Sequence, residues 1–203
     1  RMDLPTTVND ASVSYFAGEI IDFANTLSNI SGQTVEQEQI RAAVARYAEL
    51  SAILENLKSR INSGAIHGGS SRIQELYNRA STEAVVPLLK ELNRIADEPQ
   101  AAASAGVPIF LFGNVLPDPE SFSLFESCGA SIVENDLCTG SRLFGFAAQN
   151  IDKNIDELMD ETKDLFVQLA GRILSQEPCA RTFDPDHPGK MANDLLSKAL
   201  ACG

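Results

Sequence analysis

The chain has 203 residues, of which 44% are hydrophobic, and it carries a formal net charge of −12. This is enough material for one sizeable core or two small ones, whereas the acidic balance argues against nucleic-acid binding, which needs a basic face. The sequence contains no run of 18 apolar residues to span a membrane and no signal-peptide pattern. We therefore expect a cytoplasmic protein that binds neither nucleic acid nor membrane.

The first part of the chain has the periodicity of helices. Apolar residues recur at three- and four-residue steps up to Gly32, which is predicted to end the first helix. Thr34 and Gln37 have the spacing of a capping box, so a second, long helix is predicted from there to about Ile61.

A polar, glycine-rich loop follows at residues 67–71. It resembles a phosphate-binding loop only loosely, because it lacks the Lys-Thr pair of a P-loop, and we interpret it as a connection between helices. A short helix is predicted from Ser71 to about Arg79, and another from near Ser81. Residues 1–98 are thus predicted to form a helical region.

The period changes after a predicted linker at residues 99–106. Residues 107–112 form a continuous apolar run, typical of a strand buried on both faces of a parallel sheet. Asp118 and Pro119 then provide an N-cap and a first helical residue, and that helix is predicted to end at Gly129. A second strand is predicted at residues 130–133, which completes a βαβ unit.

The predicted fold class is therefore α/β, with a helical N-terminal half joined to a flavodoxin- or Rossmann-like parallel βαβ segment. This α/β segment is predicted to extend over residues 107–203, with further helices at about 155–174 and 188–200. The chain opens on Arg1 rather than methionine and stops just after a helical pattern. We expect it to be an internal piece of a longer polypeptide.

Cys138 lies a few residues past the second predicted strand, where ligands and reactive groups gather in open α/β sheets. The turn over residues 139–141 is expected to aim backbone N–H groups at the sulfur, which would stabilise a thiolate or a metal-bound sulfur. Arg142 adds a permanent positive charge nearby.

Four interpretations of Cys138 stay open: a buried structural thiol, a nucleophile, a zinc ligand and one ligand of an iron–sulfur cluster. The polar neighbours argue against apolar burial. A nucleophile would want a histidine base, and the two histidines, His67 and His187, lie far along the chain. The closely spaced ligand pairs of a zinc site are missing.

The other cysteines carry less information. Cys128 is predicted on a helix facing the core, and Cys179 is interpreted as a packed thiol after a helix, whereas Cys202 at the end of the chain allows no interpretation. Four carboxylates have the look of acid–base pairs, but with 28 acidic residues in all we favour a solvated acidic surface; they are Glu134, Asp136, Asp152 and Asp156.

The segment GNVLPDPESFSLFESCGASIVENDLCTGSRLF, residues 113–144, resembles the central segment of the 2-hydroxyacyl-CoA dehydratase and benzoyl-CoA reductase family. The DLCTGSR block is its specific part, whereas the helices before it, residues 170–174 and residues 178–181 add weaker likeness. The residues that carry the resemblance are Gly113, Pro117, Gly129, Ala130, Val133, Asp136, Cys138, Thr139, Gly140, Ser141 and Arg142.

The resemblance implies a lyase of the anaerobic cytoplasm. Its subunits pair as related chains in a heterodimer, and each holds a [4Fe–4S] cluster or a variant through three cysteines from distant segments. An ATP-dependent iron–sulfur activator supplies one low-potential electron, which in the dehydratases turns the acyl-CoA thioester into a ketyl radical that expels the 2-hydroxyl group. In the reductases the electrons stay in the product ring.

Residue by residue, the resemblance makes Cys138 a cluster ligand, with the other two ligands expected outside this chain, so that the isolated piece would be inactive. Asp136, Thr139 and Gly140 are expected to support the turn around that ligand. Ser141 and Arg142 either bind the substrate or its CoA phosphates, or hold the turn. The alternatives are a benzoyl-CoA reductase-type subunit and a cluster-carrying electron-transfer or scaffold protein without acyl-CoA chemistry.

Overall fold

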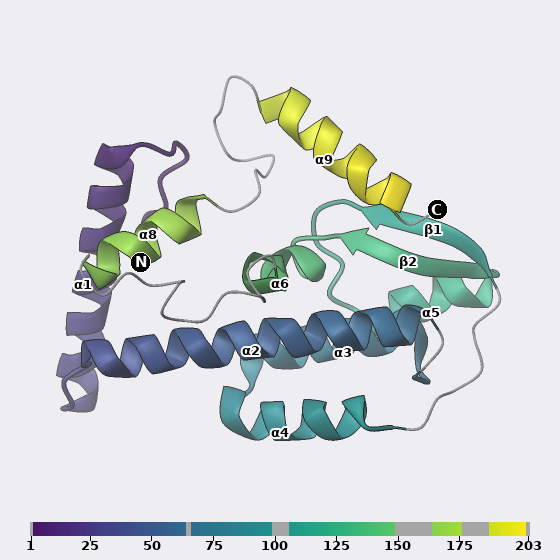
Figure 1. The fold of residues 1–203 in the computed structure, drawn as a ribbon, viewed down its shortest axis with the longest axis horizontal. Helices are drawn as coiled ribbons and strands as arrows, with labels where there is room; N and C mark the ends of the chain where they lie inside the picture. The colour runs from purple at the N-terminus through teal and green to yellow at the C-terminus, as the bar shows by residue number, and fades with distance from the viewer. Residues whose placement is uncertain (1, 64–65, 99–105, 149–163, 176–186, 202–203) are drawn as a thin grey trace. The chain divides into compact units, whose positions relative to one another are not determined.

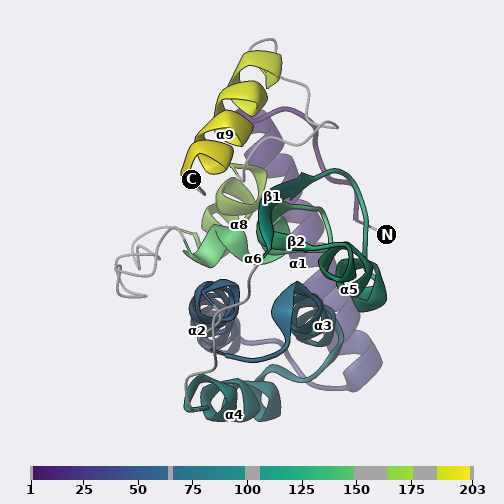
Figure 2. The same cartoon turned by 90° about the vertical axis from the view of Figure 1, so that its right-hand side faces the viewer.

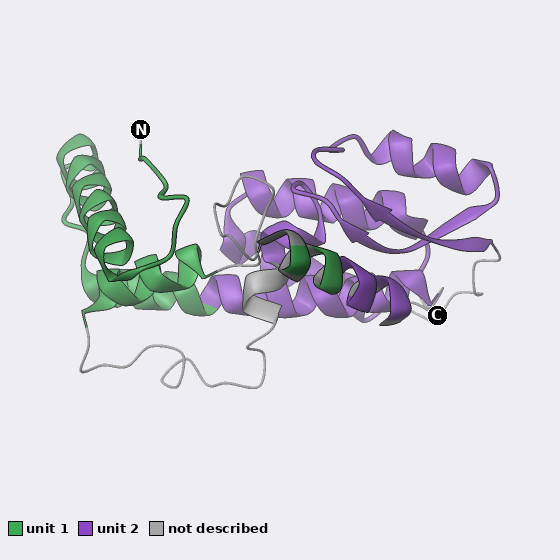
Figure 3. Cartoon of the chain, turned by 90° about the horizontal axis from the view of Figure 1, so that it is seen from above, with its two compact units in different colours: residues 1–45, 152–194 green, residues 46–151, 195–203 purple. Residues whose placement is uncertain are grey.

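The computed structural model describes residues 2–63, 66–98, 106–148, 164–175 and 187–201. The chain divides into two compact units, each made of two separate stretches of sequence. Unit 1 comprises residues 1–45 and 152–194, and unit 2 comprises residues 46–151 and 195–203 (Figure 3).

Unit 1 is built around α1 (Asp10–Ser31) and α8 (Leu165–Leu174). The side chain of Asn9 caps α1 by accepting the N–H of Ser12 at 2.9 Å. Gly32 ends the helix at φ +69°, a left-handed conformation that glycine adopts without strain, as predicted. The main core of the unit is small and consists of Phe16, Ala17, Ala170 and Leu174, while Leu165 packs separately with Ile40 and Leu169.

The helical part of unit 2 contains α3 (Gly69–Thr82), α4 (Val85–Ala96) and the greater part of α2 (Gln37–Asn62). Its core is formed mainly by leucine and isoleucine side chains, with Tyr77 stacked on Phe144 at a ring-centroid distance of 5.4 Å. The buried residues of this core are Leu50, Leu54, Leu57, Ile61, Ile66, Ile73, Leu76, Tyr77, Ala80, Leu88, Leu89, Leu92 and Ile95.

The α/β part of unit 2 runs β1 (Val107–Phe112), α5 (Pro119–Ser127), β2 (Ala130–Asp136) and α6 (Ser141–Ala148) (Figure 1). The strands pair in parallel, so the predicted βαβ unit and the α/β class are confirmed. Figure 2 shows α3 and α5 packed beside each other next to β2. A last helix, α9, spans His187–Ala201.

Two local features of the βαβ unit follow from its sequence. Asp118 caps α5 by accepting the N–H of Glu120 at 3.0 Å, and Pro119 begins the helix, as predicted. The strand register shifts between Ile109 and Phe110, so that Phe110 pairs with Glu134. A bulge of this kind re-aims the side chains that follow it, near the carboxyl ends of the strands.

The structure corrects several expectations. β1 is not buried on both faces within the described chain, since Val107 and Phe112 are 68% and 63% exposed. The N-terminus of α2 uses a different pair, because the side chain of Gln39 accepts the N–H of Glu36. The division expected near Ser81 lies inside α3. Residues 99–105 of the predicted linker and residues 155–163 of the helix expected at about 155–174 lie outside the described residues, whereas the rest of that helix corresponds to α8.

Candidate functional site

The loops that follow β1 and β2 are joined to each other by hydrogen bonds. The N–H of Cys138 donates to the carbonyl oxygen of Asn114 at 2.8 Å. In the reverse direction, the N–H of Leu116 donates to Oγ1 of Thr139 at 3.1 Å. The carboxyl ends of the two parallel strands therefore carry a single connected loop structure. Cys138 and Thr139 were named as site residues from the sequence, whereas their partners Asn114 and Leu116 were not.

The thiol of Cys138 is exposed to solvent. The hydroxyl oxygen of Thr139 points into the loop structure, where it accepts the N–H of Leu116, and Gly140 is buried. The polar sequence around Cys138 thus corresponds to an accessible thiol and not to a packed one. An accessible sulfur at a strand end is available to a metal, to a substrate or to a partner protein.

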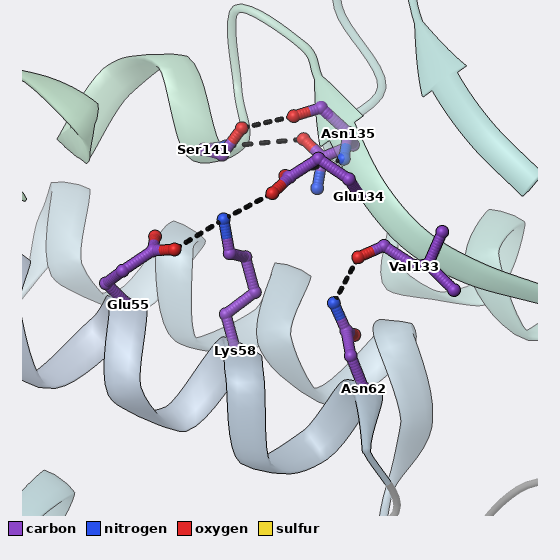
Figure 4. Close-up of polar contacts among 7 residues, drawn as sticks. All are labelled: Glu55, Lys58, Asn62, Val133, Glu134, Asn135 and Ser141. Atoms are coloured by element: carbon purple, nitrogen blue, oxygen red, sulfur yellow. Dashed lines mark hydrogen bonds and ion pairs between the residues drawn. The ribbon is translucent and has the colours of Figure 1, made fainter. Parts of the chain in front are cut away.

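Asn135 holds the turn after Cys138. Its Oδ1 accepts the N–H of Ser141 at 3.3 Å, and its carbonyl oxygen accepts the hydroxyl of Ser141 (Figure 4). The N–H of Gly140 donates to the carbonyl of Leu137 at 3.0 Å. The N–H groups of Gly140 and Ser141 are therefore used within the turn, contrary to the expectation that they point at the sulfur.

Gly140 is required by space. A Cβ atom added there would lie 2.1 Å from Oδ1 of Asn135 and 3.1 Å from its Cγ. No real Cβ contact is that short, so any side chain at position 140 would displace Asn135 and open the turn that it holds.

Arg142 and Asp136 form an ion pair at the start of α6. Nε of Arg142 donates to Oδ1 of Asp136 at 3.2 Å, and a second guanidinium nitrogen contacts Oδ2. Asp136 is 3% exposed, so it is not part of a solvated acidic surface. The carboxylate of Asp136 neutralises the positive charge of Arg142, which was expected to act near Cys138. Planar two-point contacts of this kind fix orientation as well as charge.

A second ion pair ties α2 to β2. Nζ of Lys58 lies 2.6 Å from Glu134 and 2.8 Å from Glu55 (Figure 4). Burial would lower the pKa of Lys58, but the carboxylates of Glu134 and Glu55 outweigh it and raise that pKa above its ordinary value. Beside this pair, the amide of Asn62 donates to the carbonyl of Val133 at 2.5 Å. Glu134, like Asp136, is thus paired instead of solvated.

One face of α3 contacts both strand-end loops. Oγ of Ser70 donates to the carbonyl of Ile132 at 3.0 Å, and Nε2 of Gln74 to the carbonyl of Thr139 at 2.8 Å. Nδ2 of Asn78 donates to the carbonyl of Pro117 at 2.6 Å. Reasoning from the sequence did not single out Gln74 or Asn78, and it considered Ser70 only as part of the glycine-rich loop. Their signal is a polar residue at every fourth position beside an apolar helix stripe.

The glycine-rich loop before α3 serves the helix itself. Oε1 of Glu126, from α5, accepts the N–H of Ser70 at 2.7 Å. A Cβ at Gly69 would lie 2.5 Å from the same carboxylate. The first turn of α3 therefore already holds an anion, namely a carboxylate of this chain, which agrees with the interpretation as a helix connection.

Of the remaining candidates from the sequence, some are described by the structure and others are not. Cys128 caps the C-terminus of α5 and is exposed, so the prediction that it faces the core is wrong. His67 is exposed just before α3. Several candidates lie outside the described residues: Asp152, Asp156, Cys179 and Cys202. The side chain of His187 is not described either.

The described residues do not supply a complete set of ligands for a metal cluster. Among the residues that the structure describes, no three His, Cys, Asp or Glu side chains group closely enough to hold a metal ion. Cys138 fits the role of a single cluster ligand, because its sulfur is accessible and the backbone around it is fixed by hydrogen bonds. The N–H of Cys138 donates to Asn114, and the N–H of Gly140 donates to Leu137. Over the same residues, no helix is long and apolar enough to cross a membrane.

Comparison with known proteins places the chain in a family. No curated protein matches the sequence. The sequence model of the family described as 2-hydroxyglutaryl-CoA dehydratase, D-component, matches residues 1–201, which include both strand-end loops and the whole of α3. With almost its full length covered, the chain belongs to the 2-hydroxyglutaryl-CoA dehydratase D-component family.

Proposed function

We propose that this chain is part of an iron–sulfur 2-hydroxyacyl-CoA dehydratase and that Cys138 is one ligand of its [4Fe–4S] cluster. The observation that carries the proposal is the accessible thiol at the carboxyl end of β2, in a loop that is bonded to the loop after β1. Family membership supports the dehydratase activity. The remaining ligands would come from outside the described residues.

When bound, such a cluster would supply low-potential one-electron chemistry and an iron site for the substrate's oxygen. The residues of this chain would hold the ligand in place. Asn135 fixes the turn through Ser141, Thr139 ties it to the loop after β1, and Gly140 leaves the space that Asn135 occupies.

Ser141 and Arg142 are proposed to hold the turn, since the hydroxyl of Ser141 donates to Asn135 and the guanidinium pairs with Asp136. Binding of the substrate or its CoA phosphates by these two residues stays a prediction. So do the heterodimer with a related subunit, the ATP-dependent activator and the anaerobic cytoplasm. A D-component implies association with other dehydratase components.

The test is to measure iron and sulfide content, with absorption and EPR spectra, on the full-length protein prepared anaerobically with its partner component. Cys138→Ser is compared with Cys128→Ser, a matched change at the other exposed, described cysteine. We expect loss or alteration of the cluster in Cys138→Ser alone. A protein without iron, or an unchanged cluster in Cys138→Ser, would contradict the proposal.

A benzoyl-CoA reductase-type subunit and a cluster-carrying protein without acyl-CoA chemistry are the rival functions. A protein that binds an acyl-CoA in its native state is stabilised by that ligand according to its affinity. Protection from thermal unfolding by 2-hydroxyglutaryl-CoA, but not by free CoA, would favour the dehydratase. Protection by neither would favour an electron-transfer or scaffold role.

A further inference from the structure

We infer that Gln74 and Asn78 are positioning residues that clamp the two strand-end loops from α3 and thereby set the place of Cys138. That the position of Cys138 matters rests on the proposed function, in which its sulfur is a cluster ligand. Both amides lie one helical turn apart on the same face of α3, and each reaches a different loop.

The two amides belong to one hydrogen-bond network. Nε2 of Gln74 donates to the carbonyl of Thr139, the residue after Cys138, and also to Oδ1 of Asn78 at 3.0 Å. Nδ2 of Asn78 in turn donates to the carbonyl of Pro117 in the loop after β1. Because Cys138 is itself bonded to Asn114, the clamp closes a ring of hydrogen bonds around the thiol-bearing segment.

Packing alone does not account for Gln74. The side chain is fully buried, and its Oε1 has no hydrogen-bond partner within the described chain. A buried acceptor without a partner costs stability, which an apolar side chain of the same length would avoid. What the amide contributes is the bond it donates to the loop. Such outer contacts orient a metal ligand and tune the metal that it binds.

The test uses Gln74→Met, which keeps the length of the side chain while removing both the donated bond and the unpaired oxygen. The carbonyl of Thr139 loses its donor in this variant, and removal of the unpaired oxygen offsets part of that cost in stability. Asn78→Ala, at a half-buried position, tests the other end of the clamp and serves if Gln74→Met does not fold. The matched control is Asn62→Ala, which removes an amide bond to β2 upstream of the loops.

Two measurements are made on the full-length protein with its partner component. In hydrogen exchange, we expect peptides covering 114–117 and 137–141 to exchange roughly fivefold faster in the clamp variants and unchanged in Asn62→Ala. In EPR, we expect the clamp variants to retain iron but show displaced g-values, a change that a merely structural role would not produce.

The outcomes separate the two proposals, with Cys138→Ser measured in parallel. Wild-type spectra and exchange in the clamp variants, together with loss of the cluster in Cys138→Ser, would overturn the clamp and leave the proposed function standing. An unchanged cluster in Cys138→Ser would overturn the proposed function. In that case faster exchange confined to the two loops would still support the clamp, and unchanged exchange would overturn it.

Discussion

Lys58 shows how one side chain can join distant parts of a fold. Its ammonium group is enclosed in unit 2 between Glu134 and Glu55, and its side chain is only 9% exposed. Removing one partner of such a pair leaves the other charge without compensation in a poorly solvated place.

We predict that Lys58→Met lowers the free energy of unfolding by about 3 kcal/mol. Glu134 would lose its cation, and the bond that ties α2 to β2 would go with it. Urea unfolding monitored by circular dichroism measures the effect. Lys90→Met, at an exposed position on α4, serves as the control and should change stability little. Equal effects of the two variants would show that the buried pair contributes nothing.

The pKa of Tyr77 is raised well above its usual range, first by burial and then by the negative charges of Glu55 and Glu134. The pKa of Lys58 is raised as well. The native state thus keeps both protons at a pH where the unfolded chain, with pKa values of about 10 and 10.4, begins to lose them. Stability should therefore be constant below that range and fall as the pH rises above about 10.

We predict that Tyr77→Phe makes this alkaline loss of stability shallower, because phenylalanine has no proton to lose and can keep the stacking on Phe144. Urea unfolding between roughly pH 8 and 11 gives the slope. Tyr47→Phe, at an exposed position on α2, is the comparison. The same slope in Tyr77→Phe and the parent protein would mean that the buried phenol does not contribute.

At the scale of single elements, α3 is the support of the candidate site. Its N-terminus holds the carboxylate of Glu126, its buried face joins the core, and its polar edge clamps the strand-end loops. A carboxylate at a helix N-terminus interacts favourably with the unpaired N–H groups and the helix dipole.

We expect Glu126→Gln to destabilise unit 2 by about 1 kcal/mol, since the amide oxygen can still accept a bond but the charge is gone. The loss should shrink as salt is added, because ions screen the charge of the carboxylate. Chemical unfolding at low and high salt tests both parts. Glu49→Gln on the exposed side of α2 is the control. A salt-independent loss would assign the effect to packing.

What could be predicted at this scale depended on how local the signal was. Asp118-Pro119 and Gly32 determine helix ends within one turn of chain, so α5 and the end of α1 were predicted well. The contacts of Lys58 with Glu134 and of Gln74 with Thr139 join residues 76 and 65 positions apart. The periodicity of apolar residues along the sequence cannot indicate such distant pairs. No helix was predicted at α6, which has only 8 residues and begins directly after the turn at 139–140.

The candidate site divides in the same way. The DLCTGSR block marked Cys138, and the structure places this residue at the predicted strand end. The expected roles of the neighbours were less accurate, because the side-chain partners of a turn depend on what packs against it. Asn135, which holds the turn, lies next to the block and was overlooked.

At the scale of the whole molecule, the chain has separate cores in its two units. Phe16, Ala17, Ala170 and Leu174 form the main core of unit 1, whereas α2, α3 and α4 contribute the large core of unit 2. Proteins open in cooperative units that follow such clusters of contacts. The Cys138 loops belong to unit 2, so their protection should follow the stability of that unit.

We predict that Phe16→Ala and Leu54→Ala act on different parts of the chain. Both remove a buried side chain and should cost about 3 kcal/mol in their own core. In hydrogen exchange, Phe16→Ala should speed exchange in α1 and α8, whereas Leu54→Ala should speed it in α3, α4 and the Cys138 loops. If either variant raises exchange equally throughout, the two cores open together, and stabilising unit 1 would also protect the cysteine loop. If each acts on its own unit, protection of that loop depends on unit 2 alone.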